Sequence, residues 1–223
     1  MKYEDWKKRF IVENPEKGGI IKNMVANDFE IKRENPKFTE YNPKADYSIS
    51  IPGLPDVVND GLSDACRRVA EEGSKKQCEI LELIDLYTGK QVYYEIGDYD
   101  SVGGGKYREF IERNQNGKFA FVHNHPTDGF LSSTDMETFV TTERIQAMIS
   151  ISNDGLKRIA YGDIKDSRLL VDIFSNDVEK VRVKIRNGTL EMVEYKFELQ
   201  KMLVEKSIEN FANLGFWEVD GRV

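Results

Sequence analysis

This 223-residue sequence contains two histidines separated by a single residue, and they are its strongest indication of chemical function. They are His123 and His125, they lie in the stretch FAFVHNHPTDGFLSSTD, and the chain contains no others. Imidazole nitrogen is a common ligand of divalent metals, and catalytic zinc usually has three protein ligands and one open position. The spacing therefore predicts a divalent metal site, with zinc as the expected ion.

The residues before the histidines indicate a strand that ends at Pro126. Alternate residues of a strand point to the same side of its sheet. One face of this strand is therefore predicted to carry Phe119, Phe121, His123 and His125. The two phenylalanines are expected to be buried, and the two imidazoles to emerge together at the end of the strand.

A third ligand is expected a short loop further along the chain. Asp135 stands ten residues after His125, at the start of a helix predicted for SSTDMETFVTTERIQAM, residues 132–148. The end of a regular element holds a ligand well, which favours Asp135. Asp128, in the turn TDGF, is the alternative.

These residues resemble the HxHP–x(5–7)–SxxD signature of the JAMM (MPN+) zinc metalloproteases. That family includes deubiquitinating isopeptidases and many bacterial and phage proteins, and the related RadC proteins share the form HNHP. The matching positions are His123, Asn124, His125, Pro126, Ser132 and Asp135. The five-residue spacer is at the short end, as in phage-associated JAMM-like proteins. The resemblance covers about residues 75–165.

The resemblance also implies a glutamate at the start of an earlier strand, acting as general base. The stretch CEILELID offers Glu79 and Glu82, which a strand would place on opposite faces. Strands of the family begin with glutamate and continue with mostly apolar residues, which favours Glu79. Glu82 remains the alternative, and either could be an ordinary solvated strand residue.

The implied chemistry is hydrolysis of a peptide or isopeptide bond. Zinc would polarise a water and lower its pKa. Glu79 would accept the proton and pass it to the leaving amine. Ser132 would donate a hydrogen bond to the oxyanion. Alternatively, Ser132 is a helix N-cap and Asp135 completes a capping box, a role that an aspartate bound to zinc could fill only in part.

The surrounding pattern predicts an α/β fold with a mixed, mainly antiparallel sheet flanked by helices. Hairpins are expected for 78–96 and around the NDG turn at 153–155, with further strands flanking the RNGT turn at 186–189. Helices are expected from Ser63 to Gly73, over KYREFIERN (106–114), and from Tyr195 to Leu214.

The predicted domain organisation has three parts. Residues 1–74 contain five of the six prolines and are expected to form an N-terminal extension outside the catalytic core. Residues 75–165 are expected to form the hydrolase core, and residues 166–223 to add C-terminal strands and a helix.

Composition restricts the partners. The net charge of −7 argues against nucleic acid. The start MKYEDWKKRF lacks a signal-peptide core, and no apolar run reaches the ~18 residues that span a bilayer. Cys66 and Cys78 suggest no disulfide framework, so a cytoplasmic protein is expected. The family resemblance implies a protein or peptide substrate.

Two other functions compete with the peptidase hypothesis. One is a binding or assembly module that keeps the fold without catalysis, and the other is a RadC-like protein acting around DNA. A degenerate module would usually lack part of the set Glu79, His123, His125, Ser132 and Asp135, all of which are present. The sequence therefore favours an active zinc metallopeptidase. It specifies neither the natural substrate nor the oligomeric state.

Overall fold

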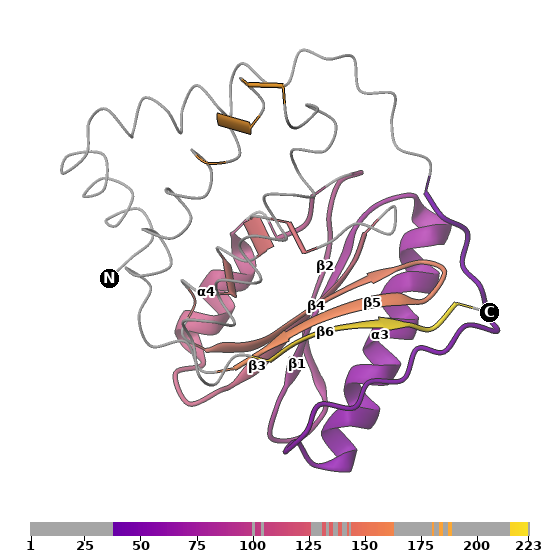
Figure 1. The fold of residues 1–223 in the computed structure, drawn as a ribbon. Coiled ribbons are helices and arrows are strands. Elements are labelled where there is room, and N and C mark those ends of the chain that lie inside the picture. Colours follow the sequence, from indigo (N-terminus) through magenta and orange to yellow (C-terminus); the bar gives the residue numbers. More distant parts are fainter. Residues whose placement is uncertain are drawn as a thin grey trace. The chain divides into compact units, whose positions relative to one another are not determined.

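A computed structural model describes the part of the chain that forms the sheet (Figure 1). The described residues are 38–99, 101–103, 105–125, 131–132, 134–135, 138–139, 142, 144–162, 180, 183–184, 187–188 and 215–222, with backbone only for 215–218. The elements with defined bounds are α3 (Asp56–Lys76), β1 (Ile80–Asp85), β2 (Gln91–Ile96), α4 (Lys106–Arg113), β3 (Phe119–His125), β4 (Ile145–Ser152), β5 (Leu156–Tyr161) and β6 (Gly215–Asp220).

The strands form one six-stranded sheet in the order β2-β1-β3-β4-β5-β6. Four of its five neighbouring pairs are antiparallel, and β3 and β4 are parallel. The predicted α/β class with a mixed, mainly antiparallel sheet is confirmed, as are the hairpins β1–β2 and β4–β5. Parallel strands require a crossover connection, so the chain between β3 and β4 must pass over one face of the sheet.

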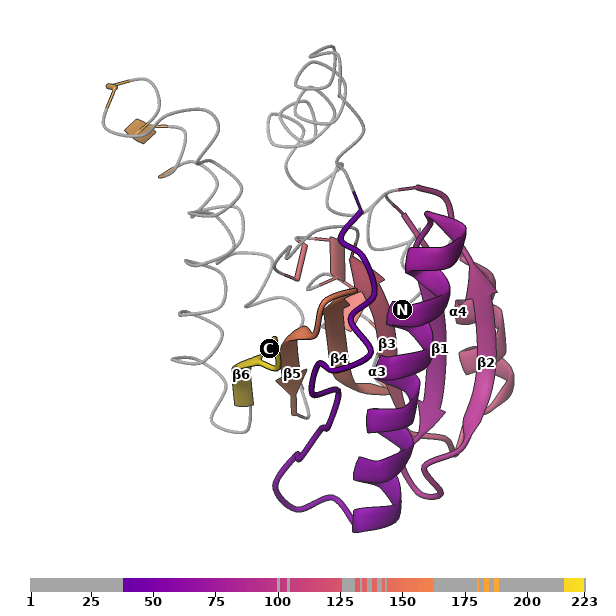
Figure 2. The same cartoon turned by 90° about the vertical axis from the view of Figure 1, so that its right-hand side faces the viewer.

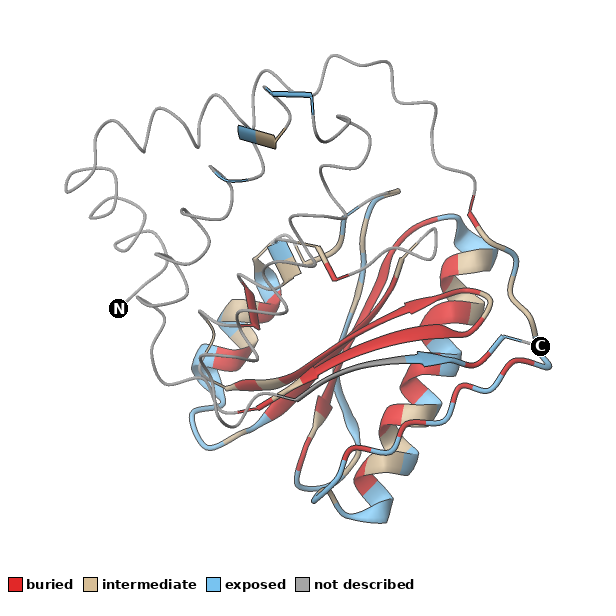
Figure 3. Ribbon diagram, viewed as in Figure 1, coloured by how far each residue is buried: buried red, intermediate tan, exposed pale blue. Residues whose placement is uncertain are grey.

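The two faces of the sheet carry separate hydrophobic clusters, which explains why the central strands are buried on both sides (Figures 2 and 3). We call them the α3 face and the α4 face, after the helix that contributes to each. Strand residues of the α3 face include Ile80, Ile84, Ala120, Val122, Ile149 and Ile151. Those of the α4 face include Leu81, Leu83, Phe119, Phe121 and Met148. The predicted division of β1 and β3 into two faces is confirmed.

Helix α3 is longer than the helix predicted from Ser63 to Gly73. It spans Asp56–Lys76, and its C-cap is Gln77, which has a left-handed backbone with φ of 56°. Ser63 lies inside the helix, where its hydroxyl donates to the carbonyl of Asn59 at 2.7 Å. Gly73 does not end the helix, which continues to Lys76. A glycine stands here because helix and sheet pack closely at this position.

The segment before α3 belongs to the core, which differs from the expectation for residues 1–74. Tyr47, Ile49 and Ile51 are at most 7% exposed and pack with α3 in the cluster of the α3 face. Every described residue lies in one compact unit, Phe38–Val223. Residues 1–37, also predicted as extension, lie outside the described part of the chain.

The helix predicted for residues 132–148 is wrong over its second half. Among its described residues, 134–135 and 138–139 are helical, whereas β4 begins at Ile145. Both faces of β4 are buried, so the alternation that would indicate a strand is hidden. The helix-forming residues of ERIQAM therefore gave a misleading pattern.

The C-terminal part of the chain is described only in places. Val183 and Lys184 are helical, so the strand expected before the RNGT turn is wrong at these residues. The helix predicted from Tyr195 to Leu214 lies outside the described residues. Strand β6, which was not predicted, pairs with β5 and completes the sheet. None of the described helices has the length and apolar character needed to cross a bilayer.

Candidate metal centre

Strand β3 brings the two histidines to the α4 face, as its alternation predicted. Their side chains follow Phe121 on that face, and the rings of Phe121 and His123 meet edge to face with centroids 5.4 Å apart. His123 is 1% exposed and His125 is 12% exposed. The imidazoles therefore stand at the polar end of an apolar strand face, largely shielded from water.

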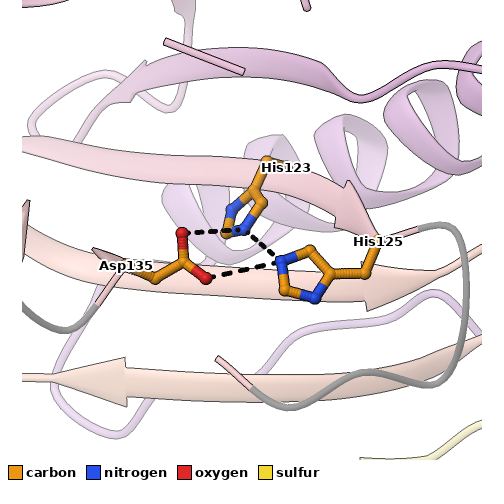
Figure 4. A group of neighbouring side chains, drawn as sticks. All are labelled: His123, His125 and Asp135. Carbon is orange, nitrogen blue, oxygen red and sulfur yellow. Dashed lines mark hydrogen bonds and ion pairs between the residues drawn. The ribbon is translucent and has the colours of Figure 1, made fainter. Parts of the chain in front are cut away.

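Asp135 joins the histidines from the connection between β3 and β4 (Figure 4). One carboxylate oxygen, Oδ1, lies 3.3 Å from Nε2 of His123, and the other, Oδ2, lies 3.4 Å from Nε2 of His125. The two Nε2 atoms are 2.8 Å apart. The crossover required by the parallel pair thus delivers the carboxylate to the end of β3 where the histidines emerge.

These three side chains form the group that can hold a metal ion within the described part of the chain. Their ligand atoms all lie within 4.8 Å of one another. Two ligand atoms bound at ~2.0–2.1 Å to a tetrahedral ion are roughly 3.3 Å apart, which is close to both nitrogen–oxygen distances. The two imidazole nitrogens, 2.8 Å apart, would have to separate by about half an ångström to share such an ion. The cluster therefore offers two nitrogens and a carboxylate that could hold a divalent ion.

The electrostatics of the cluster favour an ionised aspartate. Burial by itself would raise the pKa of Asp135, but the charge of His123 and the hydrogen bonds from both histidines outweigh it. The result is a pKa held well below the ordinary range of the group. A carboxylate that stays ionised is the form that binds a cation.

Asp135 is held in place by Ser132. The backbone N–H of Ser132 donates to Oδ2 of Asp135 at 2.6 Å, and the N–H of Asp135 donates to Oγ of Ser132 at 3.1 Å. This reciprocal pair is the capping arrangement considered as an alternative from the sequence. The carboxylate faces both histidines at the same time, so capping and metal binding are compatible here.

Glu82 lies on the α3 face, and the alternation of β1, continued by one residue, would place Glu79 on the other face. Glu82 is 2% exposed and forms a two-pronged ion pair with Arg68 of α3, at 3.0 and 2.6 Å. It is therefore a structural residue of the α3 face, on the side of the sheet opposite to the histidines. This environment argues against Glu82 as the base, a distinction that required the tertiary structure.

Glu79 is two residues before Leu81, so strand alternation would place it on the α4 face, which is the face of the histidines. Leu81 lies opposite His123 in the antiparallel register, and the same register continued by two residues sets Glu79 opposite His125. Glu79 is also paired with the chain that follows β2. Its backbone N–H donates to the carbonyl of Asp98 at 2.9 Å, and its carbonyl accepts the N–H of Gly97 at 2.8 Å. Glu79 is 7% exposed.

Asn124, between the histidines, is a residue of the site to which the sequence analysis assigned no role of its own. It is fully buried on the α3 face, and its side chain hydrogen-bonds the backbone on both sides of Glu79. Its place inside HNHP was the available signal, but its partners lie more than forty positions away. The competing ligand Asp128 lies outside the described residues.

Comparisons with protein-family models, with curated proteins and with solved structures found no match for this chain. What the fold and the site define is an α/β protein with a mixed six-stranded sheet and a His-His-Asp cluster that can hold a metal ion.

Proposed function

We propose that this protein is a zinc-dependent metallopeptidase of the JAMM type, hydrolysing a peptide or isopeptide bond. The observation that carries the proposal is the convergence of His123, His125 and Asp135 at the end of a buried strand. Glu79 immediately precedes the neighbouring strand β1, whose alternation would place it on the same face. The ligand set of two imidazoles and one carboxylate is typical of catalytic zinc, which leaves a fourth position open.

The proposed division of labour follows from the chemistry of each group. Zinc, when bound, polarises a water molecule and lowers its pKa toward neutrality. Glu79 accepts a proton as the carbonyl is attacked and delivers it to the departing amine. The hydroxyl of Ser132 accepts a hydrogen bond from the backbone of Asp135 and keeps its own proton. That proton is available for donation to the oxyanion of the substrate.

The proposed substrate is a protein or peptide. The net charge of −7 argues against a nucleic acid. Two buried free thiols, Cys66 and Cys78, are consistent with the proposed cytoplasmic location.

The metal is tested first. Protein purified without added metal should contain close to one equivalent of zinc by elemental analysis. A variant carrying both His123→Ala and His125→Ala should contain almost none, and Glu82→Gln serves as a matched control that retains it. Equal zinc in the double variant and in the wild type would refute the site.

Catalysis is tested second, with zinc-loaded protein. A proteomic cleavage screen in extract of the source cell should give products with the wild type that are missing with Glu79→Gln. If neither protein gives products beyond those of the extract alone at full zinc occupancy, the chain is a binding module, and if both give the same new products, Glu79 is not the base. Salt-sensitive binding to DNA would instead favour a RadC-like role.

A further inference from the structure

We propose that Asn124 is a positioning residue, whose side-chain amide ties the backbone around Glu79 to the strand that carries the two histidines. The proposal rests on the proposed function, because it assigns Glu79 a task beside the metal ligands. Asn124 is the residue between His123 and His125, so strand alternation sends its side chain to the opposite, α3 face. There it is fully buried.

The contacts of the amide bracket Glu79. Oδ1 of Asn124 accepts the backbone N–H of Ile80 at 2.7 Å, and Nδ2 donates to the carbonyl of Cys78 at 3.2 Å. These two residues are the immediate neighbours of Glu79 in the chain. One side chain thus bonds the strand of the ligands to the backbone before and after the proposed base.

The orientation of this amide is determined by its partners. The N–H of Ile80 requires an acceptor and the carbonyl of Cys78 requires a donor, so a flipped amide would lose both hydrogen bonds. Nδ2 also donates to Oδ1 of Asn153 at 3.3 Å. Asn153 is anchored in turn, because its own Nδ2 donates to the carbonyl of Thr39 at 2.9 Å.

The amide acts where the regular ladder between β1 and β3 stops. The paired residues of these strands run from Asp85 and Phe119 to Leu81 and His123. Beyond Leu81, the hydrogen bonds described between β1 and β3 are those made by Asn124. Next to Glu79, the amide therefore supplies the described link to β3, while the backbone of Glu79 itself is bonded to Gly97 and Asp98 on the other side.

Helix α3 is shaped to receive the amide. A Cβ atom added at Gly73 would collide with Nδ2, Cγ and Oδ1 of Asn124, its three nearest atoms. Gly73 is thus the position where the helix leaves room for this side chain. All three atoms are removed by Asn124→Ala, so an alanine at position 73 would then fit.

The ligands themselves do not depend on the amide. His123 and His125 remain paired with Ser150 and Ser152 of β4, on the other side of β3. Loss of the amide should therefore loosen the backbone around Glu79 on the side of β3, although its bonds to Gly97 and Asp98 remain, and should leave the ligands in place. This difference separates positioning of the base from general support of the fold.

The test uses the full chain loaded with Co²⁺, whose visible absorption reports the surroundings of the ion. Glu79→Gln should change the spectrum, because it removes a charge near the ion. Asn124→Ala should reproduce much of that change, and adding it to Glu79→Gln should change nothing further. Zinc affinity of Asn124→Ala should stay within about threefold of wild type, short of the 10–100-fold loss typical of groups that orient a ligand directly.

Packing is separated from positioning by Gly73→Ala. Alone, it should displace the amide and shift the spectrum as Asn124→Ala does. Combined with Asn124→Ala, it should recover stability, because alanine suits a helix and fills the vacated space, but the altered spectrum should remain. Gly61→Ala is the matched control: it collides with Gly89 far from the site and should lower stability without changing the spectrum.

The outcomes discriminate between the two proposals. A wild-type spectrum in Asn124→Ala, with an altered one in Glu79→Gln, overturns the positioning role alone. Recovery of the wild-type spectrum in the Gly73→Ala, Asn124→Ala double variant also overturns it, since packing would then suffice. If Co²⁺ fails to bind, or if Glu79→Gln changes nothing, the proposed metal centre or base is wrong and the positioning role falls with it.

Discussion

Ser132 and Asp135 cap each other, each accepting the backbone N–H of the other, at 2.6 and 3.1 Å. A carboxylate tied to a helix start in this way loses little freedom when it binds an ion. The pair therefore combines a helix cap with a preformed oxygen ligand.

We expect Ser132→Ala to separate these roles. Loss of the cap should cost about 0.5–2 kcal/mol of unfolding free energy. Zinc affinity should fall only a few-fold, about threefold, because the backbone N–H of residue 132 still orients Asp135. Hydrolysis should fall by ~10²–10³, the loss typical of an oxyanion donor. Chelator competition measures zinc affinity, and a cleavage assay measures hydrolysis. Ser132→Thr should retain both, and Thr134→Ala, at an exposed neighbouring position, should change neither. If zinc affinity and hydrolysis fell by the same factor, the role of Ser132 would be limited to holding Asp135 in place.

Glu79→Gln and Glu82→Gln should have opposite phenotypes. Glu79→Gln should retain zinc and lose ~10²–10⁴-fold in hydrolysis, because proton transfer is removed. Glu82→Gln should retain hydrolysis and lose about 1–3 kcal/mol of unfolding free energy, because it breaks the charge-assisted pair with Arg68. Urea unfolding and the cleavage assay provide the two measurements. An inactive Glu82→Gln beside an active Glu79→Gln would exchange the assignments.

Ile51→Ala should show that the segment before α3 is part of the fold. Ile51 is 1% exposed, and truncating a buried isoleucine costs about 2–5 kcal/mol. Val57, which is 58% exposed, provides the control, and Val57→Ala should stay within about 0.5 kcal/mol of wild type. Urea unfolding measures both. Equal stabilities would mean that residues around Ile51 do not contribute to the core.

Lys157 should make stability depend on pH in a defined direction. Its side chain is buried, and burial lowers its pKa from the ordinary value, an effect that Asp46, Cys66 and Asp220 partly offset. The unfolded chain thus binds this proton more tightly than the folded one. Stability contributed by the group should rise with pH from the lowered pKa toward 10.5.

The comparison with Lys157→Met isolates this effect, because the other titrating groups are shared. The variant should match or exceed wild type in unfolding free energy near pH 7, since an apolar chain replaces a buried charge. Wild type should gain on the variant as pH rises from the lowered pKa of Lys157 toward its ordinary value of 10.5. Urea unfolding across this range provides the measurement, and a gap that widens in favour of the variant contradicts the prediction.

Local patterns in the sequence were sufficient to predict that His123, His125 and Asp135 lie together. The alternation from Phe119 to His125 is a property of one strand, and the short step to Asp135 is a property of one connection. Both hairpins were predictable for the same reason, since their turn residues lie between the strands that they join.

Contacts between distant segments could not be predicted in this way. Gly73 has the pattern of a helix stop, but its partner is Asn124, fifty-one positions later in the chain. The assignment of Glu82 to the fold required its contact with Arg68. In the first half of β4, Gln146, Ala147 and Met148 favour a helix by propensity, and burial between two other strands overrides that preference.

The pairing of β1 with β3 also determines the order in which the site can assemble during folding. His123, His125 and Asp135 lie within thirteen consecutive residues, whereas Glu79 precedes them by more than forty. Closing a short loop costs less entropy than closing a long one, so the ligands can gather before the sheet exists. A metal held by this short stretch in the unfolded chain stabilises the native state less than its native affinity implies. On the proposed function, capture of the ion would thus be a local event, and proton transfer would become available only when two distant strands meet.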